Sequence, residues 1–179
     1  MLREVISRTK EHFPVDASRI YVVGIANGGF MALRLACEMG SELAGVVAYA
    51  SGLYASQCAL KTGVPMLLMQ GNADVVVPFA GGYNSAGVSF PGFRESKTIW
   101  SSINGCSASP AQSNWTARAG NNAPLNIAVS TYGDCTRDPL VAWEIDKGQH
   151  FALPDTSAVI FQKALRTFLW PLRAKASSV

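Results

Sequence analysis

Three short apolar runs constrain the fold of this chain most strongly. They are 19–23 (RIYVV), 43–48 (LAGVVA) and 65–70 (PMLLMQ). Their apolar residues are continuous and do not alternate with polar ones, which is typical of strands that a parallel sheet buries on both faces. Residues 30–39 (FMALRLACEM), between the first two runs, are good helix formers. Strand, helix, strand in this order predicts an α/β fold, with a mainly parallel sheet and helices on both faces.

The remaining segments are predicted to add helices and two further strands. Apolar spacing and length predict helices over 2–13, 94–103 and 155–170, and strands over 125–132 and 140–145. Glycine-rich residues 80–92 and polar residues 107–124 are expected to be loops. Because no internal repeat or linker interrupts the chain, we expect one domain over residues 1–179.

Residues 22–29 (VVGIANGG) carry the most informative local pattern. A buried strand passes through Gly-x-Ala-x-Gly directly into a helix. This is the nucleophile-elbow pattern Gly-x-Ser-x-Gly, with Ala26 at the serine position. In such an elbow the amide of the next residue, here Asn27, points at the oxyanion of the reaction. Taken alone, the same residues also fit a glycine-rich turn without chemistry.

Two polar segments follow later strands. Asp74 closes GNAD after the run 65–70, and His150 closes GQH after the strand 140–145. The order elbow, Asp, His is that of the α/β-hydrolase triad, in which Asp orients the imidazole and the imidazole accepts a proton. The carboxyl ends of parallel strands also meet at the edge where ligands bind. The alternatives are a turn-capping residue for Asp74 and a surface histidine for His150.

Four segments in combination resemble the polyhydroxybutyrate depolymerase and feruloyl esterase-like α/β hydrolases. They are SRIYVVGIANGGFMALRLACE, GNADVVVP, WSSINGC and GQH, and the resemblance extends from residue 15 to about residue 154. It implies a carboxylic ester hydrolase that acts on a small ester or a polyester, with Asp74 and His150 at the acid and base positions. We expect neither a cofactor nor a metal.

Two features depart from that family. Ala26 stands where the family carries serine, and a methyl group cannot attack a carbonyl, so we expect the chain to be inactive as an esterase. Only a helix precedes the run 19–23, whereas several strands and an oxyanion-binding loop normally precede the elbow. We therefore expect a partial α/β-hydrolase fold, the C-terminal catalytic half.

Three functions fit these observations. The first is an esterase scaffold whose serine has been replaced, by design or in nature. The second is a natural non-catalytic relative that binds a ligand or partner in the former active-site cleft. The third is a hydrolase in which His150 activates water. Phe79 and Leu153 are candidates for an acyl or aryl pocket, with packing beneath loops as the alternative for each.

The resemblance places Cys106 and Cys135 in cysteine-bearing segments of the family and so implies a disulfide between them. Cys37 lies on an apolar helix and is expected to be a small buried side chain, with a bridge to Cys58 as the alternative. The four spacings do not fit a zinc site. A disulfide favours an oxidising compartment, and hence a secreted or periplasmic protein.

Composition excludes several other classes. Charged residues are 15% of the chain and apolar residues 49%, which is not the balance of a disordered chain. The net charge is +3 without any block of like charges, so we expect no nucleic-acid partner. No run of eighteen apolar residues occurs, so we expect no membrane span.

The order of the parallel strands is predicted to follow the sequence, which leaves the run 19–23 at an edge of the sheet. Helices 30–39 and 94–103 are then expected on one face and the last helix on the other. An apolar unpaired edge is a template for pairing with another chain. We therefore expect this edge to be covered, by a second copy of the chain or by the N-terminal part of the fold.

Overall fold

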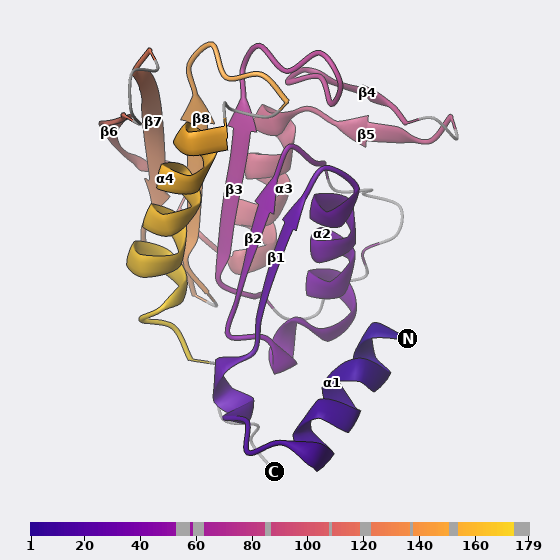
Figure 1. Cartoon of the computed structure of the whole chain (residues 1–179). Helices are drawn as coiled ribbons and strands as arrows, with labels where there is room; N and C mark the ends of the chain where they lie inside the picture. The colour runs from indigo at the N-terminus through magenta and orange to yellow at the C-terminus, as the bar shows by residue number, and fades with distance from the viewer. Residues whose placement is uncertain are drawn as a thin grey trace.

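A computed structural model describes residues 1–52, 58, 63–84, 87–107, 109–118, 123–136, 138–150 and 154–173. Its centre is a six-stranded sheet in the order β1-β2-β3-β8-β7-β6 (Figure 1). The strands are β1 (Tyr21–Ile25), β2 (Gly45–Tyr49), β3 (Met66–Gly71), β8 (Leu140–Ile145), β7 (Leu125–Tyr132) and β6 (Ala111–Ala117). The first four are mutually parallel, whereas β7 and β6 are antiparallel to their neighbours.

The parallel strands occupy the places that the apolar runs predict. Every residue of β2 and β3 is buried, which explains why these runs show no alternation. The predicted strand order is confirmed, with Met66 of β3 opposite Leu140 of β8. The observed β1 begins two residues later than the run 19–23, because residues 17–19 form a short 3-10 helix, η1 (Ala17–Arg19).

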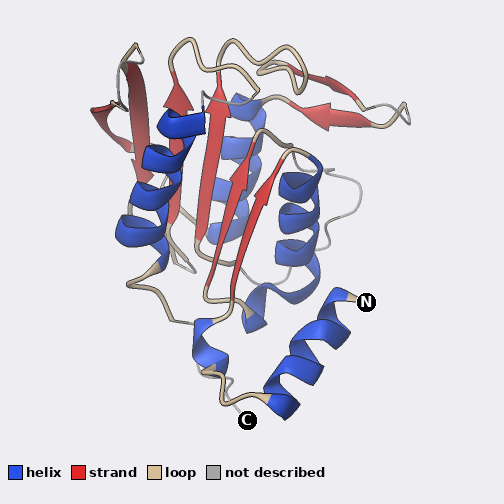
Figure 2. Ribbon diagram, viewed as in Figure 1, coloured by secondary structure: helices blue, strands red, loops and turns tan. Residues whose placement is uncertain are grey.

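Helices cover both faces of the sheet, as predicted (Figure 2). One face packs against α2 (Asn27–Met39) and α3 (Phe93–Asn104), which bury Leu33 and Trp100 against it. The other face packs against α4 (Pro154–Ala164) and its π-helical continuation η4 (Leu165–Leu169), which bury Ile160 and Phe168. Two apolar layers therefore hold the parallel strands in the middle of the domain.

Two expected loops contain strands instead. β6 lies within 107–124, and a hairpin of β4 (Gly81–Tyr83) and β5 (Ser89–Pro91) lies within 80–92. β6 is an edge strand whose first four residues are exposed, so its polar sequence carries no apolar pattern. The hairpin strands are only three residues long. Gly81 has a φ of +84°, and the backbone of Gly92 lies where a side chain of residue 81 would be, so this position requires glycine.

The opening helix is confirmed as α1 (Leu2–His12), and β1 lies at the edge of the sheet as predicted. None of the residues of α1 is buried, although Ile6 packs against the core. Val23 and Ile25 of β1 stay 45% and 36% exposed. Coverage of this edge by another chain remains a prediction. No helix within the described ranges is long and apolar enough to cross a membrane.

Two disulfides tie helices of one face to neighbouring segments. Cys106, after α3, pairs with Cys135 in the turn between β7 and β8, which is the bridge that the resemblance implies. Cys37 of α2 pairs with Cys58, so the expectation of an unpaired Cys37 is wrong. Cys37 and Cys58 are both partly buried and pack against the same core.

Candidate functional site

Ala26 joins β1 to α2 in a backbone conformation that L-residues rarely adopt. Its φ is 52° and its ψ is −122°, and it is the N-cap of α2 without any side-chain capping bond. Such conformations persist only where the surrounding structure imposes them, and they cluster at functional sites. The backbone at residue 26 therefore has the sharp strand-to-helix turn of a nucleophile elbow, although the side chain is a methyl group.

The glycines around Ala26 explain how the helix can pass so close to the strand. A Cβ on Gly24 would lie 2.0 Å from the carbonyl oxygen of Gly28. A Cβ on Gly29 would lie 2.7 Å from the carbonyl oxygen of Tyr49. Gly28, in contrast, has no atom within 4 Å of its Cβ position. Gly24 and Gly29 are thus required by close approach, whereas Gly28 is not.

The start of α2 offers backbone donors at the same point. The first helical bond runs from the Phe30 amide to the Ala26 carbonyl at 3.0 Å. The amides that precede it, beginning with Asn27, have no partner within the helix. Together with the helix dipole, such amides favour a negative charge. The geometry fits the predicted position of Asn27, whose own side chain is exposed.

Asp74 follows β3, and its carboxylate is fully buried. Its Oδ1 accepts the amides of Val76 and Val77, both at 2.9 Å. Its Oδ2 accepts from Gln70 Nε2 at 3.2 Å and lies 2.9 Å from Nδ1 of His150. A carboxylate that accepts from Nδ1 requires the proton there, so in the neutral ring Nε2 carries the lone pair.

The loops that carry Asp74 and His150 are bonded to each other, because β3 and β8 are neighbours. The amide of Ala73 donates to the carbonyl of Gly148 at 2.9 Å, and the amide of Lys147 donates to Oδ1 of Asn72 at 2.7 Å. A Cβ on Gly71 would lie 2.2 Å from the carbonyl oxygen of Gly148. These contacts therefore set the separation of the two loops.

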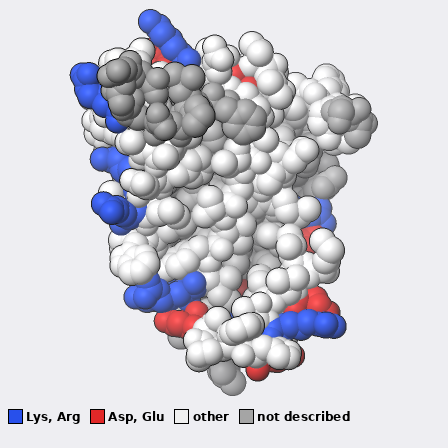
Figure 3. Space-filling view, viewed as in Figure 1, with Lys and Arg blue, Asp and Glu red and all other residues white. Residues whose placement is uncertain are grey.

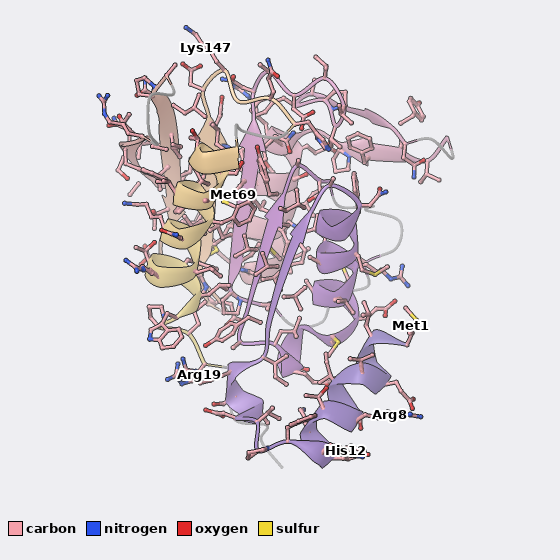
Figure 4. The ribbon with its side chains drawn as sticks, in the orientation of Figure 1. Met1, Arg8, His12, Arg19, Met69 and Lys147 are labelled. Carbon is pink, nitrogen blue, oxygen red and sulfur yellow. A yellow bond between two sulfur atoms is a disulfide. The ribbon has the colours of Figure 1, made fainter. Side chains whose placement is uncertain are left out.

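The three predicted positions follow β1, β3 and β8, whose carboxyl ends share the upper edge of the sheet in Figure 1. Lys147, which leads into the His150 loop, lies above this edge in Figure 4, and His12 lies at the opposite end of the molecule. His12 therefore lies on the opening helix, far from the ends of these strands, as the sequence predicts. The side chain of His150 is 12% exposed, so solvent can reach the imidazole while its bond to Asp74 fixes the orientation of the ring.

Phe79 packs against Phe93, with ring centroids 5.4 Å apart, and lies against the core beneath the hairpin. Its role as a substrate contact remains a prediction, and Leu153 lies outside the described residues. In the described part of the chain, no group of His, Cys, Asp and Glu is arranged to hold a metal.

Sequence reasoning missed two supporting residues. Gln70 donates from Nε2 to the carbonyl of Val77 at 2.8 Å as well as to Asp74, and so fixes the turn that carries the carboxylate. The Tyr49 hydroxyl donates to the carbonyl of Gln149 at 3.2 Å, beside His150. The sequence signal for Gln70 is its place at the end of the apolar run 65–70. A polar side chain in a buried strand is almost always hydrogen-bonded, so Gln70 should have a partner.

Comparison with known proteins identifies the family of the chain. The family model for phospholipases and carboxylesterases matches residues 1–90, which is half of the chain and includes the elbow and Asp74. The chain belongs to the phospholipase/carboxylesterase family. NocK of Nocardia uniformis subsp. tsuyamanensis, a protein inferred to be an esterase, is 37% identical over 81 residues, which are 44% of this chain and 24% of NocK.

Solved structures of esterases share the fold of this family member. A thermostable esterase superposes with a TM-score of 0.58 at 15% identity, over 96% of this chain and 36% of that esterase. Esterase PE8 superposes with a TM-score of 0.52 at 18% identity, over 94% of this chain and 59% of PE8. At these identities the likeness shows the α/β-hydrolase fold alone. The chain spans less than two thirds of the length of each of these proteins.

Proposed function

We propose that the chain is the scaffold of a serine-type carboxylic ester hydrolase, with Ala26 at the nucleophile position, and that it does not cleave esters as it stands. The observation that carries this proposal is the backbone at Ala26, with φ of 52° and ψ of −122°. An alanine gains nothing from this strained conformation, whereas a serine there would present its hydroxyl at the head of the sheet.

The bond between Asp74 and His150 supports the serine-hydrolase part of the proposal. With serine at residue 26, Nε2 of His150 would accept the proton of the hydroxyl as its oxygen attacks the ester carbonyl. The Asn27 amide would stabilise the resulting oxyanion. The imidazolium would then protonate the departing alcohol, and water would release the acid from the acyl-enzyme in the same way. Asp74 would hold the imidazole with its proton on Nδ1 throughout.

For the substrate we propose a small ester or a polyester. The resemblance to polyhydroxybutyrate depolymerases and feruloyl esterases supports this class, as does the esterase activity named for the relatives. The two disulfides support a secreted or periplasmic protein, because disulfides persist in oxidising compartments.

The second candidate function is binding without hydrolysis at the same site. Ala26 itself favours it, because the helix amides beside a methyl group can hold a carboxylate or an ester oxygen without attacking it. Hydrolysis by water activated at His150 is a third candidate, which the Asp74–His150 bond supports.

Replacement of Ala26 by serine distinguishes between these three candidate functions. We expect Ala26→Ser to raise the hydrolysis of p-nitrophenyl acetate by about 10²-fold or more, because a lone nucleophile deletion removes most of the triad's contribution. Adding His150→Ala to that variant should abolish the gain. Adding His12→Ala should leave it intact, since His12 lies on α1 at the far end of the molecule.

Equal rates with and without the serine would exclude the triad. Activity in the unchanged chain that disappears with His150→Ala would establish the water mechanism instead. Saturable binding of a short ester without hydrolysis, both before and after the serine is introduced, would establish the binding function.

A further inference from the structure

A groove lies on the α4 face of the sheet, at its antiparallel end. Its walls come from β6, β8 and the last helix, and they include Trp115, Trp143, Lys163 and Thr167. Neither Ala26 nor the Asp74–His150 pair lines this space, which we call the β6–α4 groove. Its volume is about 380 Å³, within the range of roughly 300–1,000 Å³ that small-molecule sites occupy.

Two tryptophans give the β6–α4 groove an aromatic wall. The rings of Trp115 and Trp143 meet edge to face, with centroids 5.4 Å apart. Trp143 is buried and Trp115 is half-buried, so one ring supports the other. Phe168 adds a third aromatic side chain to the lining. These aromatic side chains present a rigid apolar surface to a ligand in the groove, so binding costs them little conformational entropy.

One cation belongs to the same wall. The Lys163 ammonium lies 4.6 Å from the centroid of Trp115. No acidic residue lines the groove, and Lys163 forms no salt bridge within the described ranges. The apolar wall and the unpaired positive charge together favour a ligand that combines a flat apolar body with a negative group.

The segments around the groove carry few negative charges. Residues 107–133, which include β6 and β7, contain no Asp or Glu. Figure 3 shows Lys and Arg side chains along the side of the molecule on which α4 lies. The nearest acid on β8, Glu144, belongs to the opposite face, where burial lowers the pKa of Lys97 and Glu144 opposes that shift. An anion approaching the β6–α4 groove therefore meets no repelling carboxylate on its walls.

We propose that the β6–α4 groove is a binding site for a small aromatic carboxylate, with the carboxylate paired to Lys163 and the ring packed against the tryptophan wall. The hydroxyl of Ser113 lies at the same groove and can donate to the second carboxylate oxygen, whereas the Thr167 hydroxyl already donates to the carbonyl of Lys163 at 2.8 Å. The site is independent of the chemistry at residue 26, so it would serve an active enzyme and a non-catalytic relative equally.

Benzoate is the probe, and the indole N–H signals of the chain's 4 tryptophans are the readout in ¹⁵N-labelled protein. We expect saturable shifts of the Trp115 and Trp143 signals, with a Kd in the range of roughly 1 mM. The signals of Trp100, buried on the other face, and of Trp170, exposed beyond the helix, should not move. Benzamide, which has no charge, and acetate, which has no ring, should each bind at least about tenfold more weakly.

Matched lysine variants test the role assigned to Lys163. Lys163→Gln should weaken benzoate binding by about tenfold, and Lys163→Arg should keep it. Lys97→Gln is the control, because Lys97 also lies over an aromatic ring, 5.4 Å from the centroid of Phe93, but on the opposite face. The same spectra report whether each variant is folded. Absence of saturable shifts, equal binding of benzamide, or equal losses in Lys97→Gln and Lys163→Gln would overturn the proposal.

Discussion

The backbone amide of Ala26 donates to the carbonyl of Tyr49 at 3.0 Å. This bond joins the end of β1 to the end of β2 at a non-glycine residue with a positive φ of 52°. The same carbonyl lies where a side chain at Gly29 would have to go. The neighbouring strand and the crossing helix thus impose the elbow, whichever side chain residue 26 carries.

Ala26→Gly should therefore stabilise the protein, by about 1 kcal/mol. Glycine adopts a positive φ without the penalty of roughly 1–3 kcal/mol that other residues incur there, and the gain exceeds its greater freedom in the unfolded chain. Ala36→Gly, at a buried position of α2, is the control and should destabilise by about 1 kcal/mol or more. Urea unfolding of both variants gives the comparison, and a loss of stability in Ala26→Gly would contradict the assignment of strain.

The second prediction concerns Gly24 and Gly28, the glycines on either side of Ala26. Gly24→Ala should destabilise by about 2–3 kcal/mol, because its Cβ would lie 2.0 Å from a backbone oxygen that cannot move without shifting α2. Gly28→Ala has open space at its Cβ and should be neutral or stabilising by up to about 1 kcal/mol. Thermal melts distinguish the two, and similar melting temperatures would show that the helix crosses the strand less closely.

Asp74 can be tested in the Ala26→Ser background. Asp74→Asn should lower kcat by about 10⁴-fold, because an amide beside Nδ1 of His150 no longer fixes the productive tautomer. Asp16→Asn is the control: hydrogen bonds from the Ser18 side chain and amide lower the pKa of this carboxyl, yet it lies at η1, away from the site. A full rate in Asp74→Asn would remove Asp74 from the mechanism.

The two disulfides should each contribute to stability. They close loops of 29 and 21 residues, for which the chain-entropy model gives about 3–4 kcal/mol each. The double variant Cys106→Ser, Cys135→Ser should lower the free energy of unfolding by about that amount. Mass spectrometry of a non-reduced digest checks the pairing first, and a bridge between Cys37 and Cys106 would contradict it.

Much of the parallel half of the sheet could be predicted from the sequence, because each strand is buried on both faces and reads as a continuous apolar run. β6 could not be predicted, since its polar residues face solvent and only pairing with β7 orders them. The β4–β5 hairpin depends on Gly81 and on contacts with distant backbone, which local composition does not reveal.

At the candidate site, the order of Ala26, Asp74 and His150 was readable because each follows a strand of a parallel sheet. Gln70 was not, because its partners, Asp74 and the carbonyl of Val77, are set by the turn geometry. The β6–α4 groove was hidden for a similar reason. It forms between residues of β6 and of the last helix that are far apart in sequence.

The bonds around Asp74 make its carboxylate a part of the folded structure, whatever the chemistry at residue 26. Its carboxylate satisfies two amides of its own turn and a buried glutamine, so selection for folding alone is enough to preserve it. The side chain at residue 26 makes no such bond, and mutation can erase it without harm to the fold. Under the proposed function, an intact acid can therefore persist beside an alanine at the nucleophile position without any selection for catalysis.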